Sequence, residues 1–188
     1  MLLLLLACVE PHPPEGTLPE TDLPVVHHGV WSVADATLRQ SDAGLTLERD
    51  GGARLLAVDM VGVPAIAGDR VAFAHRDGAA EVSALDVLSV SEPEGRRRIV
   101  DRGSADRVGL SEDGAWVVWV WGVTGIASVW AAPFEGGDPV QLTNVGLKPT
   151  PGQAPAGFVA PPHRGPLTVV DGEVRWTAPD GPHAVALP

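Results

Sequence analysis

The chain has few of the features on which a functional assignment usually depends, beginning with cysteine and long apolar runs. Its 188 residues contain one cysteine, which excludes a disulfide framework within the chain. No stretch reaches the roughly 20 apolar residues that a membrane-spanning helix needs. Acidic residues outnumber basic ones and give a net charge of −11. Because nucleic-acid-binding proteins present a basic face, nucleic acid is not expected as a partner.

Motifs for the common catalytic chemistries are lacking as well. The sequence has no Gly-x-Ser-x-Gly nucleophile turn, no phosphate-binding glycine loop and no His-Glu-x-x-His metal motif. The one adjacent histidine pair, His27-His28, would point to opposite faces of a strand, so we expect two surface histidines and not a metal site. We therefore predict no catalytic residues, no cofactor and no metal, and a protein that is not an enzyme.

Charged residues of both signs fit structural positions. Arg96-Arg97-Arg98 is the only basic cluster, and Glu92 and Glu94 precede it, so we expect a solvated turn or strand end there. Most of the 24 acidic residues fall in turns, where aspartate stabilises the backbone. A hydrolase that uses two of these acids, as glycosidases do, remains an alternative hypothesis.

The start of the chain is more informative. Leucines at positions 2 to 6 are followed by Ala7 and Cys8. This arrangement resembles the lipobox of bacterial lipoproteins, which implies that residues 1–8 form a signal segment ending at a lipidated Cys8. The alternative is a disordered apolar N-terminus with an incidental cysteine. By the same resemblance, we expect a lipid-anchored protein of the cell envelope, in the outer membrane because Val9 follows the cysteine.

Residues 9–26 are predicted to be a tether. They carry five prolines, at positions 11, 13, 14, 19 and 24. Proline removes a backbone donor and favours the extended polyproline II conformation, which rises about 3.1 Å per residue. Such a segment does not join a core, so we expect the folded domain to comprise residues 27–188.

Within residues 27–188, turn signals alternate with short apolar runs. The dipeptide Asp-Gly occurs at 50–51, 77–78, 113–114, 171–172 and 180–181. Flanked by apolar residues, Asp-Gly predicts β-hairpins, because both residues tolerate positive φ. Residues 49–59 also resemble residues 76–86 at an offset of 27, which suggests an internal repeat.

The clearest unit runs from Ser111 to Thr143. Ala115 to Trp121 predicts a strand that is apolar on both faces, and Ala127 to Ala132 and Pro139 to Thr143 predict the next two strands. The four tryptophans of this unit are expected to pack in a core and not to line a carbohydrate site: Trp116, Trp119, Trp121 and Trp130.

This unit resembles the TolB-type propeller repeat. The residues that carry the resemblance are Ser111, Asp113, Gly114, Trp116, Trp130, Gly136, Gly137, Leu142 and Thr143. Glu112 stands where that repeat usually has proline. Blades of this kind take about 40 residues, so the domain has room for at most four.

We therefore predict an all-β fold, a small or incomplete β-propeller-like array of antiparallel meanders with three to four sheets. A β-sandwich of the same hairpins is the alternative. The proline-rich stretch from Lys148 to Pro166 is a candidate to cover an exposed sheet edge. The predicted function is that of a non-enzymatic envelope lipoprotein that binds a protein or glycan partner. An assembly factor acting by strand pairing is a further alternative.

Overall fold

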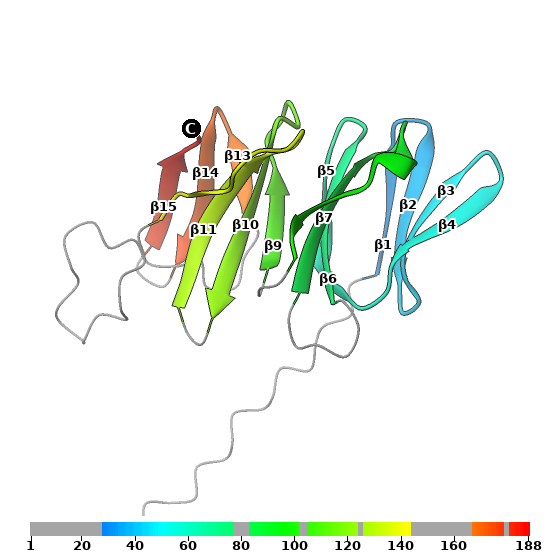
Figure 1. The fold of residues 1–188 in the computed structure, drawn as a ribbon, viewed down its shortest axis with the longest axis horizontal. Helices are drawn as coiled ribbons and strands as arrows, with labels where there is room; N and C mark the ends of the chain where they lie inside the picture. The colour runs from blue at the N-terminus through cyan, green and yellow to red at the C-terminus, as the bar shows by residue number, and fades with distance from the viewer. Residues whose placement is uncertain (1–27, 77–82, 102–104, 124–125, 144–166, 179–180) are drawn as a thin grey trace, which may run out of the picture.

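The computed structural model describes residues 28–76, 83–101, 105–123, 126–143, 167–178 and 181–188. These residues form four antiparallel sheets, and their only helix is the short 3-10 turn η1 at Pro93–Gly95 (Figure 1). No helix in this part of the chain is long and apolar enough to cross a membrane. The all-β fold of stacked meanders is confirmed.

Each sheet is a meander whose strands neighbour one another in chain order. Sheet A contains β1 (Gly29–Val33), β2 (Ala36–Ser41), β3 (Gly44–Arg49) and β4 (Gly52–Ala57). Sheet B contains β5 (Met60–Ala67), β6 (Arg70–Arg76), β7 (Ser83–Ser89) and β8 (Arg97–Val100). Sheet C contains β9 (Ala105–Leu110), β10 (Trp116–Val123), β11 (Ile126–Pro133) and β12 (Val140–Gln141). Sheet D contains β13 (Thr168–Val170), β14 (Glu173–Ala178) and β15 (Gly181–Ala186).

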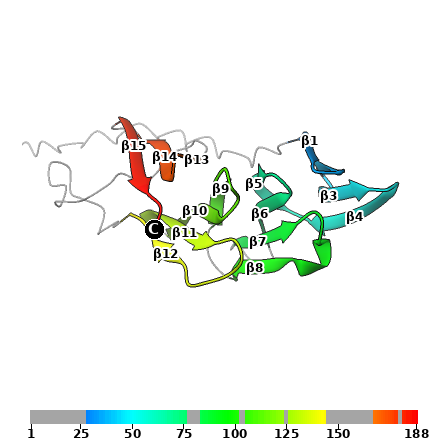
Figure 2. The ribbon, with the colours of Figure 1, turned by 90° about the horizontal axis from the view of Figure 1, so that it is seen from above.

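The four sheets are arranged as an open fan. Seen from above, the first strand of each sheet lies at the narrow side of the fan, and the last strands spread apart at the wide side (Figure 2). Sheets A and D lie at opposite ends (Figure 1). The alternative of a β-sandwich is therefore wrong, because the sheets stack in series like propeller blades instead of closing as one pair.

Strands in the middle of the fan are buried on both faces. On β6, Val71 and Phe73 belong to the core shared with sheet A, whereas Ala72 and Ala74 belong to the core shared with sheet C. Successive side chains of a strand point to opposite faces, so a strand between two sheets needs apolar residues at every position. This requirement explains why residues 71–74 of β6 are all apolar.

Sheet C repeats the pattern with larger side chains. Trp119 on β10 is 1% exposed and lies in the core with sheet B, while Val118 and Val120 face sheet D. Trp121 and Trp130 are partly buried, pack against the same core as Trp119, and form an edge-to-face pair with ring centroids 5.2 Å apart. The prediction that these tryptophans build a core is confirmed.

The outer faces of both end sheets are solvated and carry ion pairs. On sheet A, Arg39 and Glu48 face solvent and form an ion pair, with 2.9 Å between Arg39 Nε and Glu48 Oε1. On sheet D, Arg175 Nη2 lies 3.1 Å from Glu173 Oε2. Polar outer faces of this kind are what terminal units of a stacked array require for solubility. The stack of described sheets is therefore capped at both ends.

The predicted Asp-Gly turns are present where the structure describes them. Asp50-Gly51 joins β3 to β4 with φ angles of 52° and 76°, and Asp171-Gly172 joins β13 to β14 with 53° and 74°. Paired positive φ angles are typical of the two-residue turns whose twist matches adjoining strands.

The prediction of an internal repeat at an offset of 27 is wrong, because residues 49–59 and 76–86 do not occupy equivalent positions in sheets A and B. Asp50-Gly51 joins the third and fourth strands of sheet A, whereas residues 77–82 lie between the second and third strands of sheet B. The recurring feature is instead an aspartate in the first turn of every sheet: Asp35, Asp69, Asp113 and Asp171.

The turn residues that carry the propeller resemblance bond to one another. Ser111 Oγ donates a hydrogen bond to Asp113 Oδ1 at 2.6 Å and accepts one from the backbone N–H of Trp116 at 2.8 Å. Asp113 Oδ1 also accepts from the N–H of Ala115 at 2.9 Å. These residues therefore build the turn, which accounts for their place in the motif without a catalytic role.

Two leucines of sheet A test the stacking. Leu38 is 0% exposed and Leu55 is 55% exposed. We expect Leu38→Ala to lower the free energy of unfolding by about 2–5 kcal/mol, because it opens a cavity between sheets A and B. The matched change Leu55→Ala should alter it by less than about 0.5 kcal/mol. Urea denaturation of both variants measures the difference, and equal losses would contradict the stacked arrangement.

Candidate functional site

A buried carboxylate, Asp86 on β7, is the centre of a polar network that joins two sheets. Its side chain is 1% exposed. His75 Nε2 lies 2.8 Å from Asp86 Oδ2, Arg96 Nε donates to the same oxygen at 2.8 Å, and Arg98 Nε donates to Oδ1 at 3.0 Å. Both carboxylate oxygens are thus satisfied by ionic or imidazole partners, as a buried charge requires.

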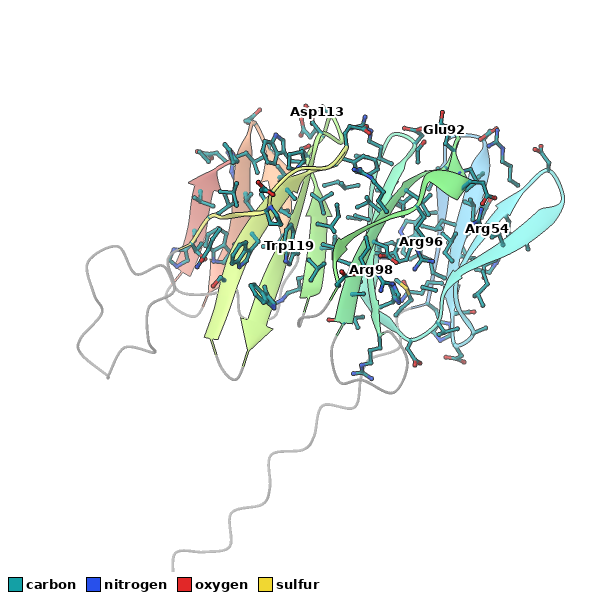
Figure 3. All side chains as sticks on the ribbon, viewed as in Figure 1. Arg54, Glu92, Arg96, Arg98, Asp113 and Trp119 are labelled. Atoms are coloured by element: carbon teal, nitrogen blue, oxygen red, sulfur yellow. The ribbon has the colours of Figure 1, made fainter. Side chains whose placement is uncertain are left out.

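The network joins two sheets. Arg96 precedes β8 of sheet B and donates a hydrogen bond to the backbone carbonyl of Leu56 on β4 of sheet A. Its guanidinium also lies over the ring of Phe73, 5.3 Å from the centroid. Arg96 and Arg98 lie together at the wide edge of sheet B, and Arg54 lies opposite them on sheet A (Figure 3).

The arginine triplet lies at a turn and strand end, as expected, but Arg96 and Arg98 are not merely solvated, because both also reach the buried Asp86. Strand pairing places Arg98 directly opposite Asp86, and this register brings the positive charges onto the buried carboxylate. Twelve positions separate the two residues in the chain, so the pair depends on the hairpin register and not on a local motif. No signal in the sequence marked Asp86 as a partner.

The environment of Asp86 shifts its proton affinity. Burial alone would raise the pKa of Asp86, but hydrogen bonds from His75, Arg98 and Arg96 outweigh burial and hold the pKa well below its usual range. Asp86 is therefore an anion at every physiological pH. An enclosed anion bound by two arginines suits a structural role and not proton transfer.

Other arginines link neighbouring sheets in the same manner. Arg70 on β6 donates to the carbonyl of Gly114 at 2.9 Å and to Glu135 at 2.7 Å, and its guanidinium lies 4.7 Å from the centroid of the Phe134 ring. Arg49 on β3 donates to the carbonyl of Val90 at 3.3 Å. Long arginine side chains thus bridge neighbouring sheets, from A to B and from B to C.

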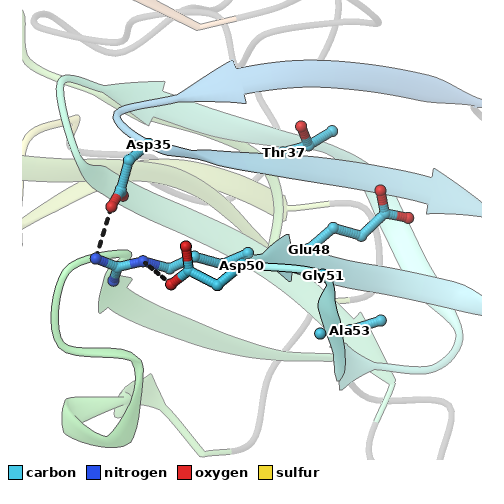
Figure 4. Close-up of a pocket in the computed structure, with 8 residues that line it drawn as sticks. Asp35, Thr37, Glu48, Asp50, Gly51 and Ala53 are labelled. Atoms are coloured by element: carbon cyan, nitrogen blue, oxygen red, sulfur yellow. Dashed lines mark ion pairs between the residues drawn. The ribbon is translucent and has the colours of Figure 1, made fainter.

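An open pocket of about 420 Å³ lies at the outer face of sheet A (Figure 4). Thr37, Glu48 and Ala53 form one cross-strand row of its floor. Its rim is made by the β1–β2 and β3–β4 turns, which contribute Asp35 and residues 50–52. The pocket is therefore a product of sheet register and of two neighbouring turns.

Arg49 organises the charges of this pocket. Its Nη2 lies 2.6 Å from Asp35 Oδ2, and its Nε lies 3.7 Å from Asp50 Oδ2 (Figure 4). Asp50 is 92% exposed, so its carboxylate is available to solvent or to a ligand. Glu48 is bound by Arg39 on the neighbouring strand. The pocket thus offers carboxylate oxygens, a guanidinium and a hydroxyl, which are groups that bind hydrogen-bonding partners.

The residues singled out from the sequence lie in different places. Cys8, residues 1–8, residues 9–26 and the stretch from Lys148 to Pro166 are outside the described residues. His28 is exposed and lies 3.2 Å from Asp42, as a surface histidine. In the described ranges, no three histidine, cysteine, aspartate or glutamate side chains gather in a group that could hold a metal ion.

Sequence reasoning identified the turn at Asp50-Gly51 but not the pocket beside it. Asp35 and Asp50 belong to different hairpins, and only the pairing of β2 with β3 places their turns at the same end of sheet A. The apolar–polar alternation of β2 and β3 could have indicated a solvated outer face, but not which side chains would share a pocket.

Taken together, the four meanders make this chain a propeller-like all-β protein. No protein-family model and no curated protein matches it. Among solved structures, it is similar to TolB from Acinetobacter baumannii, with a TM-score of 0.46 and 16% sequence identity. The match covers 86% of this chain and 43% of that protein, so the chain spans less than half the length of that TolB. The fold assignment depends on the four sheets themselves.

Asp86→Asn tests the buried network. We expect a loss of about 3–5 kcal/mol in the free energy of unfolding, because the change leaves two arginines beside a neutral amide. Asp138→Asn, at an exposed acid of sheet C's edge, is the matched control and should change stability by less than about 0.5 kcal/mol.

The free energy of unfolding of the same two variants should depend differently on pH. Since the folded state lowers the pKa of Asp86, the stability that its ionisation provides is complete above the unfolded-state pKa of about 3.9 and is lost as the pH falls below it. Chemical denaturation from pH 6 to pH 2 should show a shallower acid loss for Asp86→Asn than for wild type or Asp138→Asn. Parallel curves for all three proteins would count against the network.

Proposed function

We propose that this protein is a non-enzymatic lipoprotein of the bacterial cell envelope, anchored through a lipid on Cys8, whose propeller-like domain binds a protein or glycan partner. Residues 9–26 serve as the tether between the anchor and the domain. In this proposal the lipid is inserted in the outer membrane, and the proline-rich segment holds the domain away from the lipid surface.

The observation that carries the binding role is the open pocket on sheet A. Its exposed Asp50 carboxylate, the Arg49 guanidinium and the Thr37 hydroxyl supply donors and acceptors at one accessible place. Hydroxyl groups of a glycan and polar side chains of a protein are both bound by such groups. The pocket is open and its acids are held by arginines, which supports reversible contact more than bond cleavage.

The solvated outer faces of sheets A and D also support the proposed binding role. The outer faces of sheets A and D are solvated and carry ion pairs. A folded domain with a polar pocket at one end suits a protein that is held at a surface and presents that end to a partner.

Membrane fractionation of wild type beside Cys8→Ser in a bacterial host tests the anchor. Acylation with more than one chain gives stable attachment, so we expect wild type in the membrane pellet and Cys8→Ser in the soluble fraction. A wild-type protein that stays soluble would refute the lipoprotein proposal. Labelling with a radioactive fatty acid, present in wild type and absent from Cys8→Ser, separates acylation from adhesion.

Asp50→Asn tests the pocket, with Asp138→Asn as the control at another exposed acid. Loss of a charged hydrogen bond weakens binding by about 1.5–3 kcal/mol, or roughly 10-fold or more. We expect this loss for Asp50→Asn, with wild-type binding for Asp138→Asn. The measurement is sedimentation with purified peptidoglycan for a glycan, and crosslinking in intact cells for a protein partner. Wild-type binding by both variants would remove the pocket from the proposal.

A further inference from the structure

In the residues that the structure describes, sheet D has one strand fewer than the other three sheets. Sheets A, B and C each contain four strands, whereas the described part of sheet D contains β13, β14 and β15. In that part of the chain β15 pairs with β14 alone, so it occupies the third position and has no fourth strand beside it.

The backbone groups that face this edge can be assigned from the strand register. The N–H of Leu187 donates to the carbonyl of Gly172 at 2.8 Å, which makes this a hydrogen-bonded pair. Backbone groups alternate direction along a strand, so Val185 also points toward β14 while Ala184 and Ala186 point away from it. Two N–H and two C=O groups are therefore presented at the edge.

Prolines limit the length of this edge. Pro182 and Pro188 stand at the next two outward positions and have no N–H to offer. The free edge therefore spans residues 184–186 and offers two outward N–H groups, which is close in length to the two-residue β12, the fourth strand of sheet C. β12 pairs with β11 at Trp130 and Ala131 alone, so this protein already stabilises a fourth strand of that size.

An exposed valine faces the position of the absent strand. Val140 on β12 pairs with Ala131, whose side chain lies in the core between sheets C and D, so Val140 is on the same face. Val140 is 41% exposed. By contrast, Leu56 on β4, the fourth strand of sheet A, is 4% exposed where the next sheet does have a fourth strand. A fourth strand on sheet D would extend the existing core over Val140.

We propose that the outer edge of β15 accepts one extended segment of a partner protein as the fourth strand of sheet D. This inference goes beyond the proposed pocket on sheet A, because it adds a second contact site on sheet D for a protein with an exposed extended segment. Strand addition of this kind supplies affinity through main-chain hydrogen bonds and specificity through alternate side chains. The segment needs N–H groups at two alternate positions and an apolar side chain directed at Val140.

A single strand fits this edge better than a second copy of the chain does. Antiparallel pairing of two β15 strands would relate the copies by an axis normal to the joined sheets, which puts both copies of sheet C on the same side. There β12 already extends one strand beyond β15, because sheet C has four strands and sheet D has three. An isolated extended segment brings no second sheet into that space.

Amide hydrogen exchange, followed by NMR on the full chain, tests the inference. In the free protein we expect fast exchange at Ala184 and Ala186 and slow exchange at Val185 and Leu187, whose amides are bonded to β14. The probe is a synthetic peptide with the sequence of residues 138–143, which contains this protein's own fourth strand of sheet C. At about 2 mM peptide, exchange at Ala184 and Ala186 should slow about fivefold or more.

Two variants at one position provide the control. Ala186→Pro removes an outward N–H and no bond to β14, so it should abolish the peptide effect, whereas Ala186→Ser keeps the N–H and the effect. Slow exchange at Val185 and Leu187 in both variants reports that β14 and β15 remain paired.

Three outcomes would overturn the inference. One is an unchanged exchange rate at Ala184 and Ala186 in the presence of the peptide. Another is slow exchange at both residues in the free protein at every concentration, which would mean that a segment of the same chain occupies the edge. The third is slow exchange that appears only as the protein concentration rises, which would mean a second copy. None of these changes membrane attachment through Cys8 or the effect of Asp50→Asn, so the failure of this inference is distinct from that of the proposed function.

Discussion

Burial of β-sheets on both faces is the constraint on which the rest of this structure depends. A strand between two sheets has no solvated side, so its residues must be apolar at consecutive positions. Small residues on one face of β6, Ala72 and Ala74, meet large ones on sheet C such as Trp119, which lets the sheets approach closely. Where the stacking ends, at the outer faces of sheets A and D, the strands of these two sheets carry ion pairs on their solvated side.

The fan shape decides where polar groups are needed inside the molecule. Sheets that diverge toward the wide side cannot fill the widening gap with valine or alanine alone (Figure 2). Between sheets A and B, Arg96 spans the gap and donates to the carbonyl of Leu56. Arg70 makes a similar contact from sheet B to the carbonyl of Gly114 in the first turn of sheet C. The buried Asp86 then neutralises the arginines between sheets A and B, at the cost of its own desolvation.

Both surfaces proposed for binding lie where the regular stacking is interrupted. The pocket is on the solvated end of sheet A, beside two turns, and the open edge is on sheet D, whose described part has three strands. Interior strands have less freedom to contribute, because most side chains of strands such as β6 are used in a core. Function in a stacked array of this kind is thus expected at its ends and edges, where side chains and backbone groups are available.

Local patterns in the sequence were enough to predict the strands that flank the Asp-Gly turns, several of those turns and the apolar run around Trp119, because each depends on neighbours a few residues apart. They also limited the domain to about four sheets. Only the tertiary structure decided that Arg98 lies opposite Asp86, that Asp35 and Asp50 share a pocket, and that β15 is an edge. Those features depend on strand register and sheet order, which join residues distant in the chain and leave no local pattern.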